Sequence, residues 1–243
     1  MKSVFFFFFF LLFTSICAVA AGTSLMISTN GEPPYGSPDF TGPDDLIVRE
    51  AFQRIGINPS FSLLPSERAL INLDSGIDDG NYPRIAGIDV MYPNLLQVPE
   101  KLRDSFFVAF AQKENIKLAG WHSLASYNVA FINGWKIFEN NVGQVKSLTK
   151  VVDGRQLFTL LQNGRADIVL YEKAKGRVYI KENGLKNIYA IDPPLEKKAM
   201  YLYVHRRHEK LVPRLASAIK KMKKDGTYSS IFNQELSQFL ISK

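Results

Sequence analysis

The stretch that decides the fold runs from Arg155 to Glu172 and reads RQLFTLLQNGRADIVLYE. A similar unit occurs earlier, from Arg68 to Arg84, and reads RALINLDSGIDDGNYPR. When Gly164 is aligned with Gly76, both units show a helical apolar stripe before the glycine and an aspartate three residues after it. Each unit therefore predicts a helix that ends at a glycine, followed by a buried strand. Two such units predict two lobes.

The two units differ in their last residue. Eight positions after each glycine, the first unit has Arg84 and the second has Glu172. At matching strand ends, one lobe would offer a fixed cation and the other an anion. If the lobes face each other, this pair predicts a receptor for a zwitterion. The alternative is that both are exposed strand-end charges, because Gly-x-x-Asp alone is a common pattern.

The amino terminus has the pattern of a secretory signal peptide. Lys2 precedes an apolar run from Val4 to Phe13, and a small-x-small cleavage pattern ends at Ala20. We predict a signal peptide over residues 1–21, cleaved near Ala20 or Ala21, and a periplasmic location. The run is shorter than the roughly 20 residues that a spanning helix needs. The only cysteine, Cys17, lies inside this segment, so we expect no disulfide or thiol chemistry in the mature chain.

The formal net charge is +7, and loss of Lys2 leaves 29 basic and 23 acidic residues, or +6. Many basic residues lie late in the chain, as in the run from Lys220 to Lys224. Such a patch can bind nucleic acid or an anionic membrane, or it can be a solvated helix face. The lysines alternate with Ala216, Ile219 and Met222 at helical spacing, and no aromatic platform for bases accompanies them. We therefore expect a solvated helix and no nucleic-acid partner.

The mature chain begins with alternating strand and helix patterns. We predict a strand at 24–29, a long glycine- and proline-rich loop at 30–45, a helix from Asp44 to Ile55, a strand at 58–64 and a helix capped by Ser66. This order favours an α/β fold with a mainly parallel sheet flanked by helices. In the loop, Tyr35 follows two prolines. Its ring would either reach a binding site or cover the core of its own lobe.

A strand at 106–111 and a polar break at 112–115 indicate a crossing into the second lobe. There we expect a helical turn near Leu124, a strand at 129–132 and a glycine turn into a helix with Trp135 at its amino end, where free N–H groups could receive an anion. Asp153 is expected to cap the helix of the second repeat. A further helix from Lys173 to Glu182 and a strand at 188–191 are expected after that repeat. Pro193 and Pro194 indicate a break and a return. A strand at 201–204 and helices at 211–224 and 228–236 would complete the first lobe.

The predicted organisation is therefore a first lobe at 22–112, a second lobe at 113–195 and a return to the first lobe at 196–243. Two linking segments between the lobes would act as a hinge. A ligand cleft would lie between the lobes.

Several motifs together resemble the type II periplasmic solute-binding proteins, in particular the family that delivers polar amino acids to ABC importers. The motifs are Pro33-Pro34-Tyr35, Ser75-Gly76-x-x-Asp79, Asn163-Gly164-Arg165-Ala166-Asp167 and Lys224-Asp225-Gly226-Thr227. The resemblance covers nearly all of the mature chain. It implies a two-lobed fold in which Arg84 grips a ligand carboxylate, Glu172 receives the ligand ammonium and Tyr35 packs against the ligand.

The sequence departs from this family at two places. Many members have a threonine or serine before the arginine and a Gly-Thr pair at the start of the second-lobe helix, where this chain has Asn81-Tyr82-Pro83 and Gly134-Trp135. Trp135 would either stack on an aromatic or cationic ligand group or pack within its lobe. Arg68 would either reach the cleft or pair on its own helix, and we favour the second.

The resemblance implies a monomeric binding protein without catalysis. Its partners would be an amino-acid-like ligand and an ABC permease. We expect no cofactor or metal, since His122, His205 and His208 lie in no zinc-binding motif. Two alternatives stay open. One is a periplasmic enzyme resembling the cyclohexadienyl or prephenate dehydratases, with Glu172 protonating a leaving hydroxyl. The other is an orphan ligand sensor without a transporter.

Overall fold

The computed structural model describes residues 24–240, with side chains up to residue 234. The predicted signal peptide, its cleavage site and Cys17 lie outside the described residues. Within 24–240, none of the helices combines the length and the apolar character that a bilayer crossing requires.

The fold is a mixed α/β arrangement around a nine-stranded sheet with the order β2-β1-β3-β9-β5-β8-β6-β7, in which β4 also pairs with β9. This confirms the predicted fold class. The strands are β1 (Met26–Thr29), β2 (Ser60–Leu63), β3 (Gly80–Ile85), β4 (Leu95–Gln97), β5 (Arg103–Ala111), β6 (Asn128–Ile132), β7 (Ser147–Val151), β8 (Ile168–Glu172) and β9 (Tyr189–His205). The α-helices are α1 (Pro43–Gln53), α2 (Ser66–Asp74), α3 (Lys136–Asn141), α4 (Gly154–Gln162), α5 (Lys173–Glu182), α6 (Val212–Asp225) and α7 (Thr227–Leu240). Short 3₁₀ helices are η1 (Ile88–Val90), η2 (Trp121–Ser126) and η3 (Arg206–Leu211).

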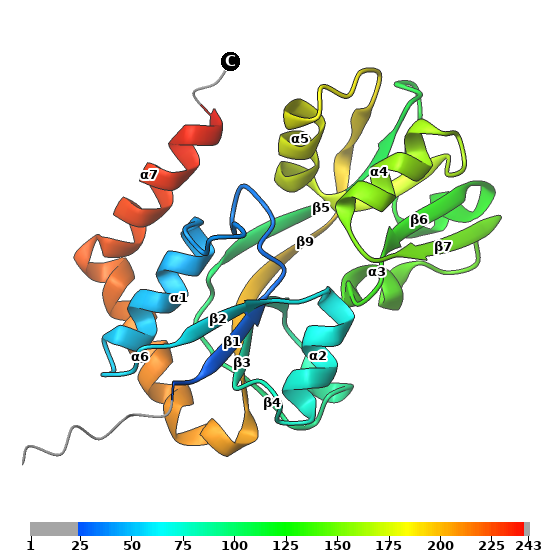
Figure 1. Cartoon of the computed structure of the whole chain (residues 1–243). Coiled ribbons are helices and arrows are strands. Elements are labelled where there is room, and N and C mark those ends of the chain that lie inside the picture. The colour runs from blue at the N-terminus through cyan, green and yellow to red at the C-terminus, as the bar shows by residue number, and fades with distance from the viewer. Residues whose placement is uncertain (1–23, 241–243) are drawn as a thin grey trace, which may run out of the picture.

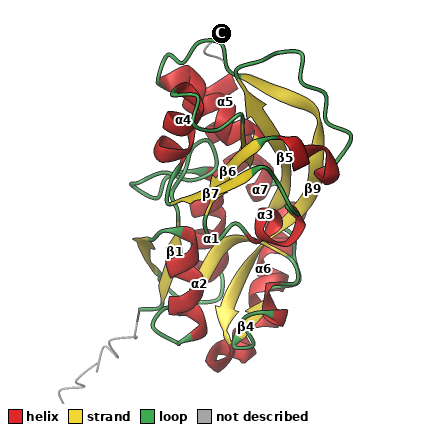
Figure 2. Ribbon diagram, turned by 90° about the vertical axis from the view of Figure 1, so that its right-hand side faces the viewer, coloured by secondary structure: helices red, strands yellow, loops and turns green. Residues whose placement is uncertain are grey.

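The elements gather around two ends of this sheet (Figure 1). We call β1 to β4 with α1, α2, α6 and α7 the first lobe, and β6 to β8 with α3, α4 and α5 the second lobe. The long strands β5 and β9 pair with each other and connect the two lobes, as the view turned by 90° also shows (Figure 2). Exact lobe boundaries near 112 and 195 stay a prediction.

The repeat seen in the sequence is a repeat in space. In the first lobe β1 pairs in parallel with β2 and β3, and in the second lobe β6 pairs in parallel with β7 and β8. Asp79 accepts a 2.8 Å hydrogen bond from the backbone N–H of Met26, and Asp167 accepts one of the same length from Asn128. Each aspartate therefore fixes the start of the neighbouring strand. This shared role explains why the Gly-x-x-Asp step recurs.

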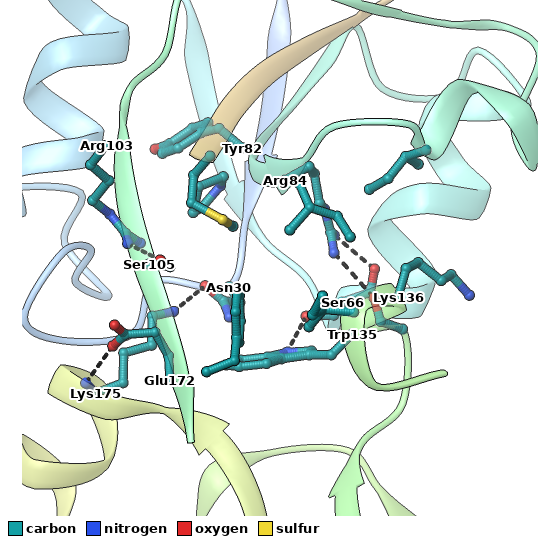
Figure 3. A pocket seen from close by; sticks show the side chains of 17 residues that line it. Asn30, Ser66, Tyr82, Arg84, Arg103, Ser105, Trp135, Lys136, Glu172 and Lys175 are labelled. Atoms are coloured by element: carbon teal, nitrogen blue, oxygen red, sulfur yellow. Dashed lines mark hydrogen bonds between the residues drawn. The ribbon is translucent and has the colours of Figure 1, made fainter. Parts of the chain in front are cut away.

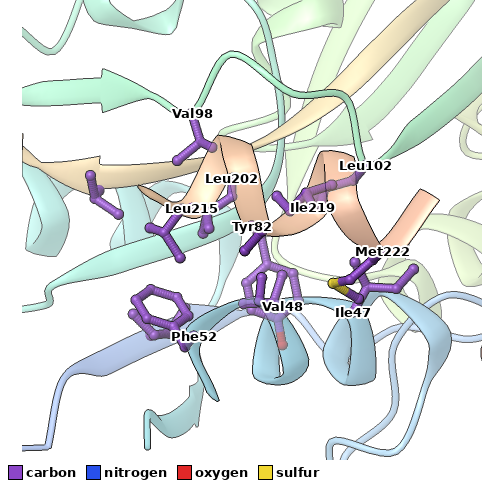
Figure 4. Close-up of a cluster of buried hydrophobic side chains, with 14 residues drawn as sticks. Ile47, Val48, Phe52, Tyr82, Val98, Leu102, Leu202, Leu215, Ile219 and Met222 are labelled. Carbon is purple, nitrogen blue, oxygen red and sulfur yellow. The ribbon is translucent and has the colours of Figure 1, made fainter. Parts of the chain in front are cut away.

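The core of the first lobe lies between α1 and α6 (Figure 4). Ile47, Val48 and Phe52 of α1 meet Leu215, Ile219 and Met222 of α6, and all are buried. Tyr82 joins this cluster from β3, and its hydroxyl donates to Asp45 across 2.7 Å. The opposite face of α6 exposes Lys220, Lys221 and Lys224, as their helical spacing predicts. The carboxyl-terminal segment therefore packs on the first lobe.

Two local predictions were wrong, and strand β7 was missed. The strands predicted at 188–191 and 201–204 are parts of one strand, β9. Pro193 and Pro194 lie within β9 where its pairing with β5 shifts register, so their missing N–H groups are not needed for the ladder. Ser66 is the first helical residue of α2 rather than its cap, which is Pro65. Strand β7 was not predicted, because an exposed edge strand lacks the apolar alternation that marks a half-buried one.

Candidate ligand site between the lobes

A pocket of about 540 Å³, counted to include its open mouth, lies between the two lobes. Its lining combines charged and apolar side chains from both. The charged ones are Arg84, Arg103, Lys136, Glu172 and Lys175, and the apolar ones include Ile85, Ile88, Phe107, Trp135, Ile137 and Met200. Arg84 and Glu172 thus line the same pocket, and Figure 3 shows them on opposite sides of it.

Arg84 is buried near the end of β3 and has no carboxylate partner within ion-pair distance among the described residues. Its guanidinium donates to the carbonyl oxygen of Ser66 at 2.8 Å and to that of Gly134 at 3.5 Å, and also to the side chain of Asn81. Burial lowers the pKa of Arg84 to about 10, because the cation is desolvated without full compensation. A carboxylate entering the pocket would supply that compensation.

Glu172 is the last residue of β8 and the N-cap of α5, and only 2% of it is exposed. Its Oε2 accepts from the backbone N–H of Lys175 at 2.8 Å, and its Oε1 accepts from that of Phe106 at 3.4 Å. No cationic side chain in the described part of the chain forms an ion pair with it. Glu172 is therefore a buried carboxylate held by the backbone, with room for a cationic partner.

The other three cations of the lining already have acidic partners. Arg103 pairs with Asp44 at 2.9 Å, and Lys175 pairs with Glu32 at 2.9 Å. Lys136 pairs with both Glu67 and Glu139, at 2.7 and 2.6 Å. Arg84 and Glu172 are therefore the two lining charges that the described protein atoms leave without an ion-pair partner.

Trp135 both packs within its lobe and lines the pocket. Its ring stacks on Tyr171 at a centroid distance of 4.8 Å and on Phe138 at 5.8 Å, while its Nε1 donates to Ser66 Oγ at 3.1 Å. In Figure 3 the ring lies along one wall of the pocket. The N–H of Gly134, two residues before α3, donates to Glu139 at 3.1 Å and is not free for an anion, while Lys136 and Ile137 of the first turn of α3 line the pocket, so anion binding at this helix end stays a prediction.

Tyr35, which the family resemblance places against the ligand, is absent from the pocket lining. Its ring lies against the guanidinium of Arg103, 3.5 Å from the ring centroid, and beside Phe232. Tyr35 thus contacts a lining residue without lining the pocket itself. Arg68 is exposed and does not line the pocket either. Among residues 24–240, no group of three or more His, Cys, Asp or Glu side chains is placed to hold a metal.

Sequence reasoning missed several lining residues, above all Arg103, Lys175 and Ser66. Lys175 lies three residues after Glu172, so the first turn of α5 places it beside that carboxylate, and this spacing could have been used. Arg103 gave no comparable signal. It lies at the start of a strand that was predicted to begin only at 106, and its partner Asp44 is 59 residues away.

Several side chains make contacts between the two lobes around the pocket. Lys175 of the second lobe reaches Glu32 and Asn30 of the first, and Lys136 reaches Glu67. The Trp135 to Ser66 hydrogen bond also crosses between lobes. Closest of all is Gly134, where an added Cβ would lie 2.3 Å from the backbone nitrogen of Glu67. The structure therefore shows the lobes closed over the pocket.

Comparison with known proteins agrees with this fold. No family model matches the sequence. An uncharacterized protein of Shewanella oneidensis is 27% identical over 202 residues, covering 80% of this chain and 76% of its own length. The L-cystine-binding protein TcyA of Bacillus subtilis is 24% identical over 216 residues, covering 85% of this chain and 79% of TcyA.

Solved structures are similar over most of the chain. A histidine kinase sensor domain described as similar to periplasmic binding proteins superposes with a TM-score of 0.76 at 20% identity, covering 88% of this chain and 96% of that one. The amino acid ABC transporter substrate-binding protein AbpA from Streptococcus pneumoniae, solved with L-arginine, gives 0.72 at 15% identity, covering 87% and 94%. The chain therefore has the fold of the periplasmic binding proteins.

Proposed function

We propose that this protein captures a small zwitterionic, amino-acid-like metabolite between its lobes and presents it to a membrane importer. The observation that carries the proposal is the pair formed by Arg84 and Glu172. Both are buried in one interlobe pocket, they have opposite charges, and neither has an ion-pair partner in the described protein. Burying an unpaired charge is costly, so a site that keeps one of each sign is suited to a ligand with both.

The expected contacts can supply enough binding free energy for micromolar affinity. Hydrogen bonds to charged groups contribute about 1.5 to 3 kcal/mol each. A carboxylate on Arg84 and an ammonium on Glu172, together with burial of apolar ligand surface, would supply much of the roughly 8 kcal/mol that micromolar binding requires. The guanidinium suits a carboxylate because its fork can donate two parallel bonds.

We propose an importer as partner because of the proteins that this chain resembles. One of them, AbpA, is a substrate-binding protein of an amino acid ABC transporter. A periplasmic location and monomeric state belong to the same proposal. Movement would occur where β5 and β9 connect the lobes. The importer would then recognise the closed form.

We expect Gly134→Ala to hinder closure. The new methyl group would meet the backbone of Glu67 at 2.3 Å, so the lobes would have to stay further apart. Affinity should fall by about tenfold or more, which corresponds to about 1.4 kcal/mol. Gly164→Ala is the matched control, because Gly164 also has a positive φ but nothing within 4 Å of an added Cβ. Small-angle scattering with and without ligand reads out compaction. Equal affinity and compaction in both variants would contradict closure at Gly134.

The test of the function is native mass spectrometry of the freshly purified protein, followed by thermal-shift screening with amino acids, polyamines and small carboxylates. We expect a retained or added mass of an amino-acid-like compound and a rise in melting temperature. Turnover of prephenate would instead select the enzyme alternative. Response to polyamines or dicarboxylates, with none to amino acids, would contradict the zwitterion site.

A further inference from the structure

We propose that the ligand carries no charge beyond one carboxylate and one ammonium, and that its side group is apolar, aromatic or aliphatic. This inference rests on the proposed function and narrows its substrate class. It predicts a preference for neutral amino acids over those with a charged side chain, such as arginine, lysine or glutamate.

The first argument is the balance of charges in the pocket. Of five charged lining residues, Arg103, Lys136 and Lys175 are each neutralised by a carboxylate within 3 Å. This leaves one cation, Arg84, and one anion, Glu172, which the two ends of a zwitterion would use. A third charge on the ligand would be buried with no ion-pair partner among the described residues, at a cost of several kcal/mol.

The second argument concerns the face of Trp135. An aromatic wall can bind either a flat apolar group or a cation. Here the ammonium of Lys175 already lies 5.6 Å from the Trp135 ring centroid, held there by Glu32 and Asn30. A cationic ligand group placed on this ring would compete with the Lys175 ammonium, which already makes the cation–π contact with Trp135. The aromatic wall therefore favours an uncharged group.

The third argument is the remaining lining. Ile85, Ile88, Phe107, Ile137 and Met200 are apolar, and all except Ile85 are buried. The neutral polar side chains beside them each have at least one protein partner already. Ser66 accepts from Trp135, Ser105 accepts from Arg103, and Asn30 is bonded to Glu32 and Lys175. Burial of apolar ligand surface in this part of the pocket would therefore stabilise the complex, by about 25 cal/mol per Å².

Titration calorimetry of the wild-type protein tests the inference with six amino acids. L-phenylalanine, L-leucine and L-methionine should include the tightest ligand, at least tenfold tighter than L-arginine, L-lysine and L-glutamate. If an amino acid with a charged side chain binds tightest, this inference is overturned and the proposed function stands. If none of the six binds, and screening finds no other zwitterion, the proposed function itself fails.

A variant tests the role of Lys175. Lys175→Met removes the cation beside Trp135 and leaves Glu32 without its ion-pair partner. The affinity ratio of L-arginine to L-phenylalanine should rise at least tenfold, even if loss of an interlobe contact weakens both. Lys173→Met is the control, since Lys173 lies on the same helix, pairs with the exposed Asp192 and does not line the pocket. An unchanged ratio in Lys175→Met would overturn the inference. Should that variant fail to fold, the wild-type series still decides.

Discussion

Arg84→Ala is expected to abolish the ligand-induced rise in melting temperature and to weaken binding of the preferred amino acid by about 100-fold or more. The bidentate contact with the carboxylate would be lost, and about 3 kcal/mol corresponds to roughly that factor. Because Arg84 forms no ion pair with described residues, its removal breaks only hydrogen bonds to Asn81, Ser66 and Gly134. It also removes a desolvated cation. The unliganded melting temperature should therefore change little.

Thermal shift and calorimetry check this result, with Arg68→Ala as the control from an exposed position outside the pocket. The control should keep the wild-type affinity. The opposite result for Arg84→Ala would identify Arg84 as a structural residue. In that case the unliganded melting temperature would fall by more than about 6 °C, the shift that about 3 kcal/mol produces in a chain of this length, while ligand binding would persist.

Glu172→Gln is expected to weaken binding by about 30- to 100-fold. The ligand ammonium would then face a neutral amide instead of a carboxylate, and charge-assisted hydrogen bonds are roughly twice as strong as neutral ones. Glutamine is preferable to alanine here because Glu172 caps α5 by accepting from Lys175 N–H. Alanine would also lose the cap, which contributes about 1 kcal/mol to stability.

The matched control is Glu182→Gln, at the exposed opposite end of the same helix. Calorimetry should show wild-type affinity for this control. If Glu172→Gln binds the amino acid as tightly as the wild type does, Glu172 does not contact the ammonium. A large loss of unliganded stability in Glu172→Gln would instead make it mainly a helix cap.

The repeat allowed much of the fold to be predicted from the sequence. The apolar stripes, the glycine stops and the aspartates at 79 and 167 all depend on local spacing, and the structure shows both aspartates in equivalent hydrogen bonds. The predictions failed where tertiary pairing overrides local signals. Pro193 and Pro194 read as a break, yet they occupy an unpaired part of β9, and β7 exists because β6 pairs with it.

Two residues of the candidate site were named from the sequence for the same reason. Arg84 and Glu172 follow from the repeat, and both line the pocket. Which other lining charges are neutralised depends on contacts between lobes, such as Lys175 with Glu32, 143 residues apart in the chain. No local pattern reveals such a pair. Tyr35, which the resemblance places at the ligand, lies against the guanidinium of Arg103 and outside the pocket lining, so its contact with a ligand stays a prediction.

The paired and unpaired charges of the pocket therefore have different roles. Ion pairs such as Arg103 with Asp44 are almost fully buried and fix the shape of the walls. Removing one partner of such an ion pair would leave a buried charge uncompensated, which typically costs about 3 to 5 kcal/mol. Arg84 and Glu172 are held instead by backbone groups and, for Arg84, also by the Asn81 side chain, so no protein carboxylate or cation in the described residues neutralises them.

The central claim is that these two residues hold opposite ends of one ligand, and truncated ligands test it most directly. Calorimetry would compare L-phenylalanine with 3-phenylpropanoate, which lacks the ammonium, and with 2-phenylethylamine, which lacks the carboxylate. Another neutral amino acid and its analogues would serve if it binds more tightly. We predict that each truncation weakens binding at least tenfold in the wild type, and that Arg84→Ala no longer distinguishes the full ligand from the amine. Equal binding of either truncated analogue and the full amino acid would contradict the account.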